Sequence, residues 1–508
     1  MAEEKKGLSL LKNEDWMGVW LGFLIIALIV LGVQAKMPSF KWTTDGEFMS
    51  MVSENTPAVE TLVKSAGEKG EADLLVASTT LRTAMGGQDR KAIGDAAKTL
   101  GAAKVQDAAL KKKAGAISKD VSGAAGQLVG KVFSSGNILW SIYIGLGFLI
   151  LATIGNALMG RKVGAFLLGF PVIYILAWLS MFIAGNFTVS YWGLEYVLWA
   201  LIIGLFISNV LGVPEWLKEA IRTEYYIKTG LVILGAGILF FEILQAGAYG
   251  IIQAILVVSV IWYTCFWLAK KLRVDDEFAA ILATGVSICG VSAAIAACGA
   301  IQGDKKKLSY TTSIILVCAV PMMVLMPWIV RVLGIPDVVG GAWLGGTLDT
   351  SGSVVAAGSL VSEAAMKVGV IVKFSQNVLI GVAAFILAVW WAFKTGAQTG
   401  ERPSAGVIWE RFPKFVLGFL VASIVFSFFL PATTVSATKG VLGGLRTVWF
   451  ALAFTCIGLE TRFGQLASME GGRPAVAFLG AQGFNIIWTL ILAYLLFGGT
   501  LFPMPVIK

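Results

Sequence analysis

The stretch Thr284-Gly-Val-Ser-Ile-Cys-Gly-Val-Ser-Ala-Ala294 lies inside an apolar segment, residues 277–302, whose centre is dense in glycine and serine. A second stretch of this kind, Gly345-Gly-Thr-Leu-Asp-Thr-Ser-Gly-Ser-Val-Val-Ala-Ala-Gly358, lies inside residues 336–367. Glycine allows a helix to break at membrane depth, and serine and threonine hydroxyls can satisfy the backbone groups that the break frees. Two such interruptions in one chain are typical of the substrate site of a secondary transporter.

The composition of the whole chain indicates a membrane protein. Of the 508 residues, 57% are hydrophobic and 14% are charged, whereas soluble domains carry about 25% charged residues. We therefore expect an all-α polytopic fold of about 10–12 transmembrane helices, since each needs roughly 20 apolar residues to cross a bilayer. The predicted spans are residues 138–158, 163–184, 195–212, 228–246, 248–270, 308–334, 370–393, 414–430, 440–459 and 474–498. The two Gly/Ser-rich stretches are predicted to be interrupted helices or re-entrant hairpins.

The distribution of lysine and arginine predicts the orientation of the chain. Loops that carry these cations, such as residues 160–162 and 270–273, alternate with loops that carry almost none. With the N-terminus in the cytoplasm, every cationic loop lies on the cytoplasmic side, as the positive-inside rule requires. If residues 277–302 crossed the membrane fully, the lysines at 305–307 would lie outside, so the rule favours an interruption, either a re-entrant hairpin or a broken helix.

The order of the predicted spans indicates an inverted repeat. The pair 228–246 and 248–270 and the pair 440–459 and 474–498 run in opposite predicted directions. Internal repeats of opposite direction are common in secondary transporters.

Three regions of the chain differ in composition. Residues 1–35 contain the first apolar run, which we interpret as an uncleaved membrane anchor, with a signal peptide as the alternative. Residues 36–136 are rich in alanine, lysine and glycine, and apolar residues recur at three- and four-residue spacing from 71 to 85. This pattern predicts a small extracytoplasmic helical domain. Residues 137–508 form the predicted transmembrane transporter domain.

Several classes of function are excluded by what the sequence lacks. It has no histidine, which excludes His-ligated metal sites, Ser-His-Asp hydrolysis and histidine proton relays. It has no phosphate-binding loop or dinucleotide-binding glycine motif, so neither ATP-driven transport nor enzymatic activity is expected. The net charge of +9 lies largely in loops beside apolar runs, which favours contact with lipid headgroups over nucleic acid. We expect no cofactor apart from a coupling ion, either Na⁺ or H⁺.

The polar residues of the Gly/Ser-rich stretches, and those of the span that follows, are candidate ligands for an anion. Broken helices expose N-termini whose free N–H groups and positive dipole attract negative charge. The candidate substrate-binding residues are Ser287, Cys289, Gly290, Ser292, Thr347, Thr350, Ser351, Ser353, Lys373 and Asn377. For the small residues, close helix packing is the alternative. For Lys373, the alternative is snorkelling of the side chain to the membrane interface.

Two acidic residues are candidates for binding the coupling ion. Asp349 lies in the second Gly/Ser-rich stretch, where capping of the half-helix that follows explains it equally well. Glu363 precedes Lys367 by four residues, a spacing at which a local ion pair is the simpler explanation.

The two stretches resemble the signatures of a known family. Thr284-Gly-Val-Ser-Ile-Cys-Gly-Val-Ser-Ala-Ala-Ile-Ala-Ala297 and Gly341-Ala-Trp-Leu-Gly-Gly-Thr-Leu-Asp-Thr-Ser-Gly-Ser-Val-Val-Ala-Ala-Gly358 are similar to motifs of the YeiH-type, UPF0324-like sulfate exporters. Lys373-Phe-Ser-Gln-Asn377 is similar to the lysine segment that follows them. The resemblance implies a secondary transporter of the bacterial inner membrane, within the broad clan of cation/proton antiporters and anion transporters. Where the family's second motif carries a His-Glu pair, this chain has Leu348-Asp349, so a proton-linked scheme that uses that histidine cannot operate.

These observations predict a secondary active transporter, in the direction of export, of a small anion such as sulfate, sulfite or a sulfonate. Its expected partners are this anion, the lipid bilayer and, in a homodimer, a second copy of the chain. One alternative is a cation/proton antiporter that uses Asp349 or Glu363. Another is a non-transporting membrane receptor that acts through its exported helical domain.

Overall fold

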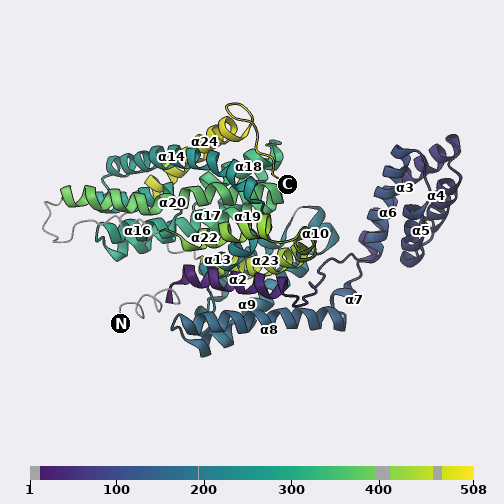
Figure 1. Ribbon diagram of the computed structural model, residues 1–508, viewed down its shortest axis with the longest axis horizontal. Coiled ribbons are helices and arrows are strands. Elements are labelled where there is room, and N and C mark those ends of the chain that lie inside the picture. Colours follow the sequence, from purple (N-terminus) through teal and green to yellow (C-terminus); the bar gives the residue numbers. More distant parts are fainter. Residues whose placement is uncertain (1–11, 193, 395–408, 410–411, 462–471, 508) are drawn as a thin grey trace. The chain divides into compact units, whose positions relative to one another are not determined.

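The computed structural model describes residues 12–192, 194–394, 409, 412–461 and 472–507 (Figure 1). Over these residues the secondary structure is helical, apart from an isolated bridge between Trp42 and Asn186. The predicted all-α fold is therefore confirmed. The chain divides into two compact units: one comprises Met1–Ala35, Gly145–Trp178 and Ala200–Lys508, and the other comprises Lys36–Ile144 and Leu179–Trp199.

The second of these units contains a bundle of four helices. They are α3 (Asp45–Glu68), α4 (Ala72–Met85), α5 (Arg90–Ala102) and α6 (Ala108–Ala125), followed by the short α7 (Val129–Val132). Their apolar faces enclose a core in which Phe48, Leu81 and Val121 are fully buried. The apolar spacing from 71 to 85 thus predicted α4 correctly. Thr43 N donates to Gln127 O over 2.7 Å, so the chain enters and leaves this bundle at one point.

Seven helices among the described residues are long and apolar enough to cross a membrane, which confirms a polytopic membrane protein. They are α8 (Ser135–Leu158), α9 (Val163–Ala184), α14 (Phe240–Lys271), α17 (Lys305–Val332), α20 (Glu363–Lys394), α23 (Ala432–Glu460) and α24 (Arg473–Phe497). The predicted spans 195–212 and 414–430 form shorter helices, α11 (Tyr196–Phe206) and α22 (Lys414–Ile424), each followed by a π-helical turn, η1 (Ile207–Leu211) and η2 (Val425–Phe429). Two further short helices in the described part of the chain are α10 (Phe187–Tyr191) and α12 (Glu215–Lys218).

One predicted boundary between spans was wrong. The span expected over 228–246 is the shorter α13 (Thr223–Gly235), and the break follows it at 236–239, before α14 begins. Glu242 stabilises this start, because its Oε2 accepts a hydrogen bond of 3.1 Å from Leu239 N. Gly250, near the predicted break, lies within α14 instead, where an added Cβ would lie 2.8 Å from Ser375 Oγ. This glycine therefore permits close helix packing rather than a turn.

The first Gly/Ser-rich stretch forms a re-entrant hairpin of α15 (Asp276–Ser287) and α16 (Val291–Ala300). The base of the hairpin is fixed by Lys307 in the first turn of α17, whose Nζ lies 2.8 Å from Asp275 Oδ1 and 3.2 Å from Glu277 Oε2. The chain therefore leaves the hairpin beside the point where it entered. This arrangement keeps the lysines at 305–307 on the same side as residues 270–273, as the charge distribution predicted.

The second stretch forms another hairpin, of α18 (Asp337–Thr347) and α19 (Ser351–Val361), and both legs pack on α20. A Cβ added at Gly341 in α18 would lie 2.4 Å from Ala365 O. A Cβ added at Gly358 in α19 would lie 2.5 Å from Met366 Cα. Both legs thus meet the start of α20 near one point, as a hairpin requires.

The two hairpins enter the bundle from opposite ends of α20. Lys394, the last residue of α20, pairs with Asp276 at the base of the first hairpin. The base of the second hairpin lies against the first turns of α20. The tips of both hairpins can therefore meet near the middle of the bundle.

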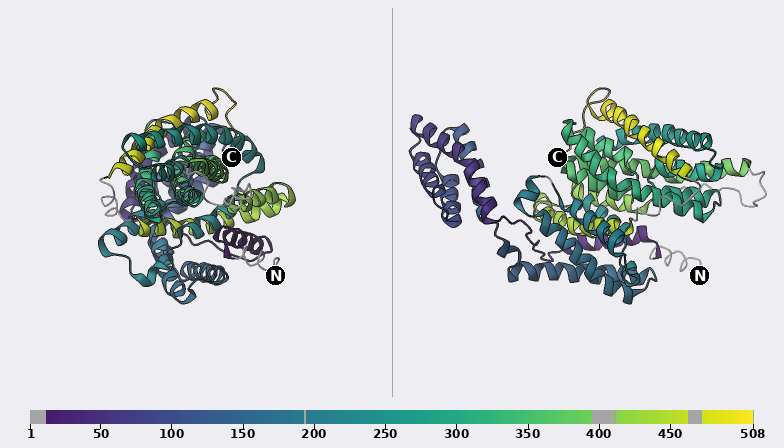
Figure 2. Two further views of the ribbon diagram at one scale, coloured as in Figure 1. Left: turned by 90° about the vertical axis from the view of Figure 1, so that its left-hand side faces the viewer. Right: turned by 180° about the vertical axis from the view of Figure 1, so that it is seen from behind.

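The flanking helices pair in opposite directions. Thr223, at the start of α13, donates to Glu460, at the end of α23, over 2.9 Å. Gly230, farther along α13, packs against the ring of Phe450. Figure 2 shows the yellow α24 lying along α14, the helix that follows α13. The opposite directions predicted for an inverted repeat are thus confirmed for α13 and α23.

The first apolar helix, α2 (Glu14–Val30), packs against α13 and α22. Two glycines permit this close approach. A Cβ added at Gly18 would lie 2.9 Å from Lys228 Cβ, and one at Gly22 would lie 2.5 Å from Val232 Cγ1. This is a small-xxx-small contact of the kind that joins helices in membranes. It places the first turn of α2 beside α13.

Candidate functional site

The tips of the two hairpins touch each other. The first tip, residues 288–290, turns at Gly290, whose φ of +63° is a conformation that glycine adopts at little cost. A Cβ at this position would lie 3.1 Å from Asp349 O and 3.2 Å from Asp349 Cβ, in the second tip. Two stretches that are far apart in the sequence therefore form one centre.

The helices α16 and α19 both begin at this centre. Thr350 caps α19: its Oγ1 accepts a hydrogen bond of 3.0 Å from Ser353 N and lies 2.6 Å from Ser353 Oγ. The first N–H groups of a helix have no partner within the helix, and the helix dipole is positive at this end. Two such ends at one centre favour the binding of negative charge.

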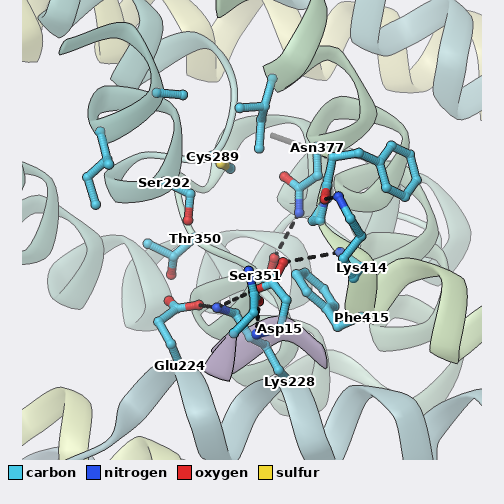
Figure 3. Close-up of a pocket in the computed structure, with 16 residues that line it drawn as sticks. Asp15, Glu224, Lys228, Cys289, Ser292, Thr350, Ser351, Asn377, Lys414 and Phe415 are labelled. Atoms are coloured by element: carbon cyan, nitrogen blue, oxygen red, sulfur yellow. Dashed lines mark hydrogen bonds and ion pairs between the residues drawn. The ribbon is translucent and has the colours of Figure 1, made fainter. Parts of the chain in front are cut away.

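A cavity of about 230 Å³ lies beside the tips (Figure 3). It is lined by five of the predicted site residues, Cys289, Ser292, Thr350, Ser351 and Asn377. Asn377 Nδ2 donates to Ser351 Oγ over 3.2 Å, whereas Asn377 Oδ1 has no hydrogen-bond partner among the described residues. Pockets for drug-sized ligands have volumes of roughly 300–1,000 Å³, so this smaller cavity suits a small solute.

Lys373 does not line the cavity but holds the first tip. It is 1% exposed, and its Nζ donates to Ile288 O over 2.7 Å and to Gln376 Oε1 over 2.6 Å. The side chain therefore does not reach the membrane interface, and the alternative of snorkelling is wrong. Lys373 positions the tip from which α16 begins.

Asp349 is buried in the second tip without a hydrogen bond to its side chain. Neither carboxylate oxygen has a partner within the part of the chain that the structure describes, and the same holds for Ser287 Oγ and Thr347 Oγ1. Thr350, not Asp349, caps α19, so the capping alternative for Asp349 is wrong. An ionised carboxylate without a hydrogen-bond partner is costly in a protein interior, so burial favours the neutral form of Asp349.

The remaining predicted residues lie at other positions. The Glu363 side chain is 61% exposed and lies 3.9 Å from Lys367 Nζ, near the base of the second hairpin. The structure thus places Glu363 away from the tips, and the local ion pair is what forms. Ser353 lines a second cavity, of about 220 Å³, together with Thr350. In the described residues no group of three or more acidic or cysteine side chains could hold a metal ion.

The sequence analysis missed the charged residues that line the main cavity. They come from three helices: Asp15 from α2, Glu224 and Lys228 from α13, and Lys414 from α22. Lys228 Nζ lies 2.7 Å from Asp15 Oδ1 and 3.6 Å from Glu224 Oε2. Two signals in the sequence pointed to them: the spacing of Gly18 and Gly22 in the first apolar run, and a lysine at the start of a predicted span.

Comparisons with known proteins identify relatives of this chain. Residues 168–477 match the family described as conserved hypothetical protein 698. A UPF0324 membrane protein of Rhodopirellula baltica, RB9488, is 43% identical over 371 residues, which cover 70% of this chain and 68% of the relative. A UPF0324 membrane protein of Nitratidesulfovibrio vulgaris is 38% identical over 379 residues, which cover 72% of this chain and 65% of the relative.

The matched region thus spans about two thirds of the length of these relatives. No solved structure matches the chain. The predicted family resemblance is confirmed: the chain belongs to the conserved hypothetical protein 698 family, whose relatives are UPF0324 membrane proteins.

Proposed function

We propose that this membrane protein is a secondary transporter of a small anion, such as sulfate, sulfite or a sulfonate, and that it works in the direction of export. The observation that carries the proposal is the meeting of two re-entrant hairpins whose half-helices, α16 and α19, both begin at one small polar cavity. Backbone N–H groups at these ends would bind the anion, and the hydroxyls of Ser292 and Ser351 would complete its shell. The protein would lie in the bacterial inner membrane with its N-terminus in the cytoplasm and residues 36–136 outside.

Asp349 is the proposed site of the coupling ion, either H⁺ or Na⁺. Its carboxylate is buried in the second tip, and its backbone adjoins Gly290 in the first tip. Uptake of a proton or cation at Asp349 would neutralise a negative charge next to the anion cavity. This would favour anion binding, so that binding of the ion and binding of the anion would be coupled.

Transport by purified protein in liposomes tests the assigned cavity. Uptake of radiolabelled sulfate and sulfite is measured for the unaltered chain, for Ser351→Ala and for Ser292→Ala. We expect each substitution to lower the uptake rate by about tenfold or more, since a lost hydrogen bond to a charged ligand costs roughly 1.5–3 kcal/mol.

A serine on the same half-helix provides the control. Ser359 in α19 donates to Val355 O over 2.7 Å and does not line the cavity. Ser359→Ala should therefore transport at close to the unaltered rate. If Ser351→Ala and Ser292→Ala also transport at that rate, the cavity is not the anion site.

The buried carboxylate of Asp349 also favours a second candidate, cation/proton antiport. Asp349→Asn separates the two functions, because it removes the charge but keeps the size of the side chain. An antiporter should lose all exchange of Na⁺ for H⁺, whereas an anion transporter should still bind its anion but lose the response of uptake to an ion gradient.

A further inference from the structure

A lysine side chain that lines the cavity, Lys228, already forms an ion pair with a carboxylate, that of Asp15. Lys228 is 9% exposed, and its Nζ lies 2.7 Å from Asp15 Oδ1. The other carboxylate oxygen of Asp15 accepts a hydrogen bond of 3.1 Å from the backbone N–H of Lys414, the first residue of α22. An ammonium group and a helix N-terminal amide are donors by which proteins bind free anions. Asp15 is thus bound as an anionic solute would be.

This carboxylate lies in the same cavity as the hairpin tips. Asp15 and Lys228 line it together with Thr350 and Ser351, from the start of α19. Figure 3 shows Asp15 between Lys228 and Lys414, with Ser351 next to it. The donors that hold Asp15 and the hydroxyls assigned to the anion therefore surround one space.

The position of Asp15 is set by the packing of α2. Gly18 lies less than one turn after Asp15 and allows the backbone of α2 to pack against the side chain of Lys228. A Cβ added at Gly18 would lie 2.9 Å from Lys228 Cβ. Asp15 is therefore a tethered group. It can leave Lys228 by a movement of the first turn of α2 without leaving the protein.

Two more carboxylates make the surroundings of Lys228 negative. Glu224 Oε2 lies 3.6 Å and Glu14 Oε1 lies 3.8 Å from Lys228 Nζ. Three carboxylates around one ammonium group repel an incoming anion until one of them moves away. Glu14 has a second partner in Arg161, at 3.6 Å, whereas Asp15 is the carboxylate at hydrogen-bond distance from Lys228. Asp15 is therefore the group that competes for this cation.

We propose that Lys228 is the cation that receives the transported anion, and that Asp15 is a tethered competitor that occupies Lys228 until the anion arrives. This inference rests on the proposed function, because it names the cation and the counter-ion of the same site. Exchange of Asp15 for the anion would break the contact of 2.7 Å between Asp15 in α2 and Lys228 in α13. Occupation of the cavity would then change the contact between α2 and α13.

Anion binding by the purified full-length protein tests the proposal. Isothermal titration calorimetry with sodium sulfate and sodium sulfite gives the dissociation constants. Asp15→Asn keeps the size of the side chain and removes its charge, so we expect binding about 5- to 10-fold tighter than that of the unaltered chain. Glu14→Gln removes a neighbouring charge that is not hydrogen-bonded to Lys228, so it should tighten binding less than Asp15→Asn does. Lys228→Gln should weaken binding at least about tenfold, with or without Asp15→Asn.

The outcomes separate this inference from the proposed function. If the unaltered chain binds the anion and Asp15→Asn binds it no more tightly, Asp15 is not a competitor, although the proposed function stands. If Lys228→Gln binds as tightly as the unaltered chain, the assignment of Lys228 is wrong. If neither the unaltered chain nor any variant binds either anion, both proposals are wrong. Should Asp15→Asn fail to give a monodisperse protein, Asp15→Ser removes the same charge and decides the question.

Discussion

Lys373 Nζ in α20 donates a hydrogen bond of 2.7 Å to Ile288 O in the tip of the first hairpin. Lys373 Nζ also donates to Gln376 Oε1. The Nε2 of Gln376 in turn donates a hydrogen bond of 3.0 Å to Gly346 O, just before the tip of the second hairpin. Two residues one turn apart in α20 thus connect both tips. We infer that α20 fixes the separation of the two half-helix ends that line the cavity.

Replacing Lys373 with methionine removes this connection but keeps the length of the side chain. Ile288 O and Gln376 Oε1 lose a charged donor inside the protein, which costs about 1–3 kcal/mol. We expect a lower midpoint of thermal unfolding for the purified protein. We also expect anion uptake to fall by about tenfold or more, because small displacements of binding groups have large effects on rate.

Lys367→Met provides the control for this substitution. Lys367 is also buried in α20, near the base of the second hairpin, where its Nζ lies 3.9 Å from Glu363 Oε1. Lys367→Met should destabilise the protein, but it should reduce uptake per folded molecule less than Lys373→Met does. Equal losses of uptake in the two variants would contradict the role of Lys373 at the tips.

Gly290→Ala should damage the contact between the tips. The φ of +63° disfavours any side chain, and the added Cβ would lie 2.8 Å from Ile315 Cγ2 and 3.1 Å from Asp349 O. Backbone strain and overpacking together cost about 2–5 kcal/mol, so we expect reduced stability in thermal unfolding and loss of uptake.

Gly334→Ala separates these two costs. Gly334 has nearly the same φ, +61°, but an added Cβ would have no atom within 4 Å among the described residues. It should therefore show only the cost of strain, about 1 kcal/mol, and normal uptake. If the two variants are destabilised equally, the tips are not in close contact.

The hairpins could be predicted from the sequence because two independent patterns agreed. The glycine and serine content of residues 284–294 predicted a break, and the lysines at 305–307 predicted that the chain returns to its starting side. That the two tips meet could not be derived in this way. The contact between Gly290 and Asp349 depends on tertiary packing, and local patterns describe only the chain on either side of each residue.

The charged wall of the cavity was missed for the same reason. Asp15 reaches Lys228 because Gly18 and Gly22 bring α2 against α13, a contact between segments separated by about two hundred residues. The break before α14 was predicted between residues 246 and 248, but these residues lie within α14, where Gly250 permits contact with Ser375. Glycine marks close packing and turns alike, and only the neighbouring helix distinguishes them.

The stability of the four-helix bundle should depend on pH through Glu47. Burial alone would raise the pKa of this carboxyl, but hydrogen bonds from Thr188, from Thr44 and from Asn186 outweigh burial and lower it to about 2. The ordinary value is 4.5, so the ionised carboxylate stabilises the folded bundle above pH 4.5. This stabilisation is lost as the pH falls from 4.5 toward 2. Hydrogen exchange of the amides in residues 44–52, measured at pH 6 and at about pH 3, should show the loss of protection.

Glu47→Gln should remove much of this pH dependence, since the amide cannot ionise. Its hydrogen exchange at pH 6 should approach that of the unaltered protein at about pH 3, after correction for the intrinsic exchange rate. Glu54→Gln, at an exposed position on the same helix, should leave the pH dependence unchanged. A pH dependence that persists in Glu47→Gln would contradict the assignment.

Removal of the four-helix bundle distinguishes a transporter from a receptor that acts through this bundle. Thr43 N donates to Gln127 O over 2.7 Å, so the two ends of the bundle already adjoin. A flexible linker of about four Gly and Ser residues covers roughly 10–12 Å, which is enough to replace residues 45–126 without displacing the chain on either side. We expect the shortened protein to transport the anion within about threefold of the full-length rate, because the helices that line the cavity are α2, α13, α20, α22 and those of the hairpins, all outside the bundle. A receptor would lose its activity with the bundle.

If the shortened protein is monodisperse and still binds sulfate but no longer transports it, the bundle takes part in the transport cycle. The assignment of transport to the helices around the cavity alone would then be wrong.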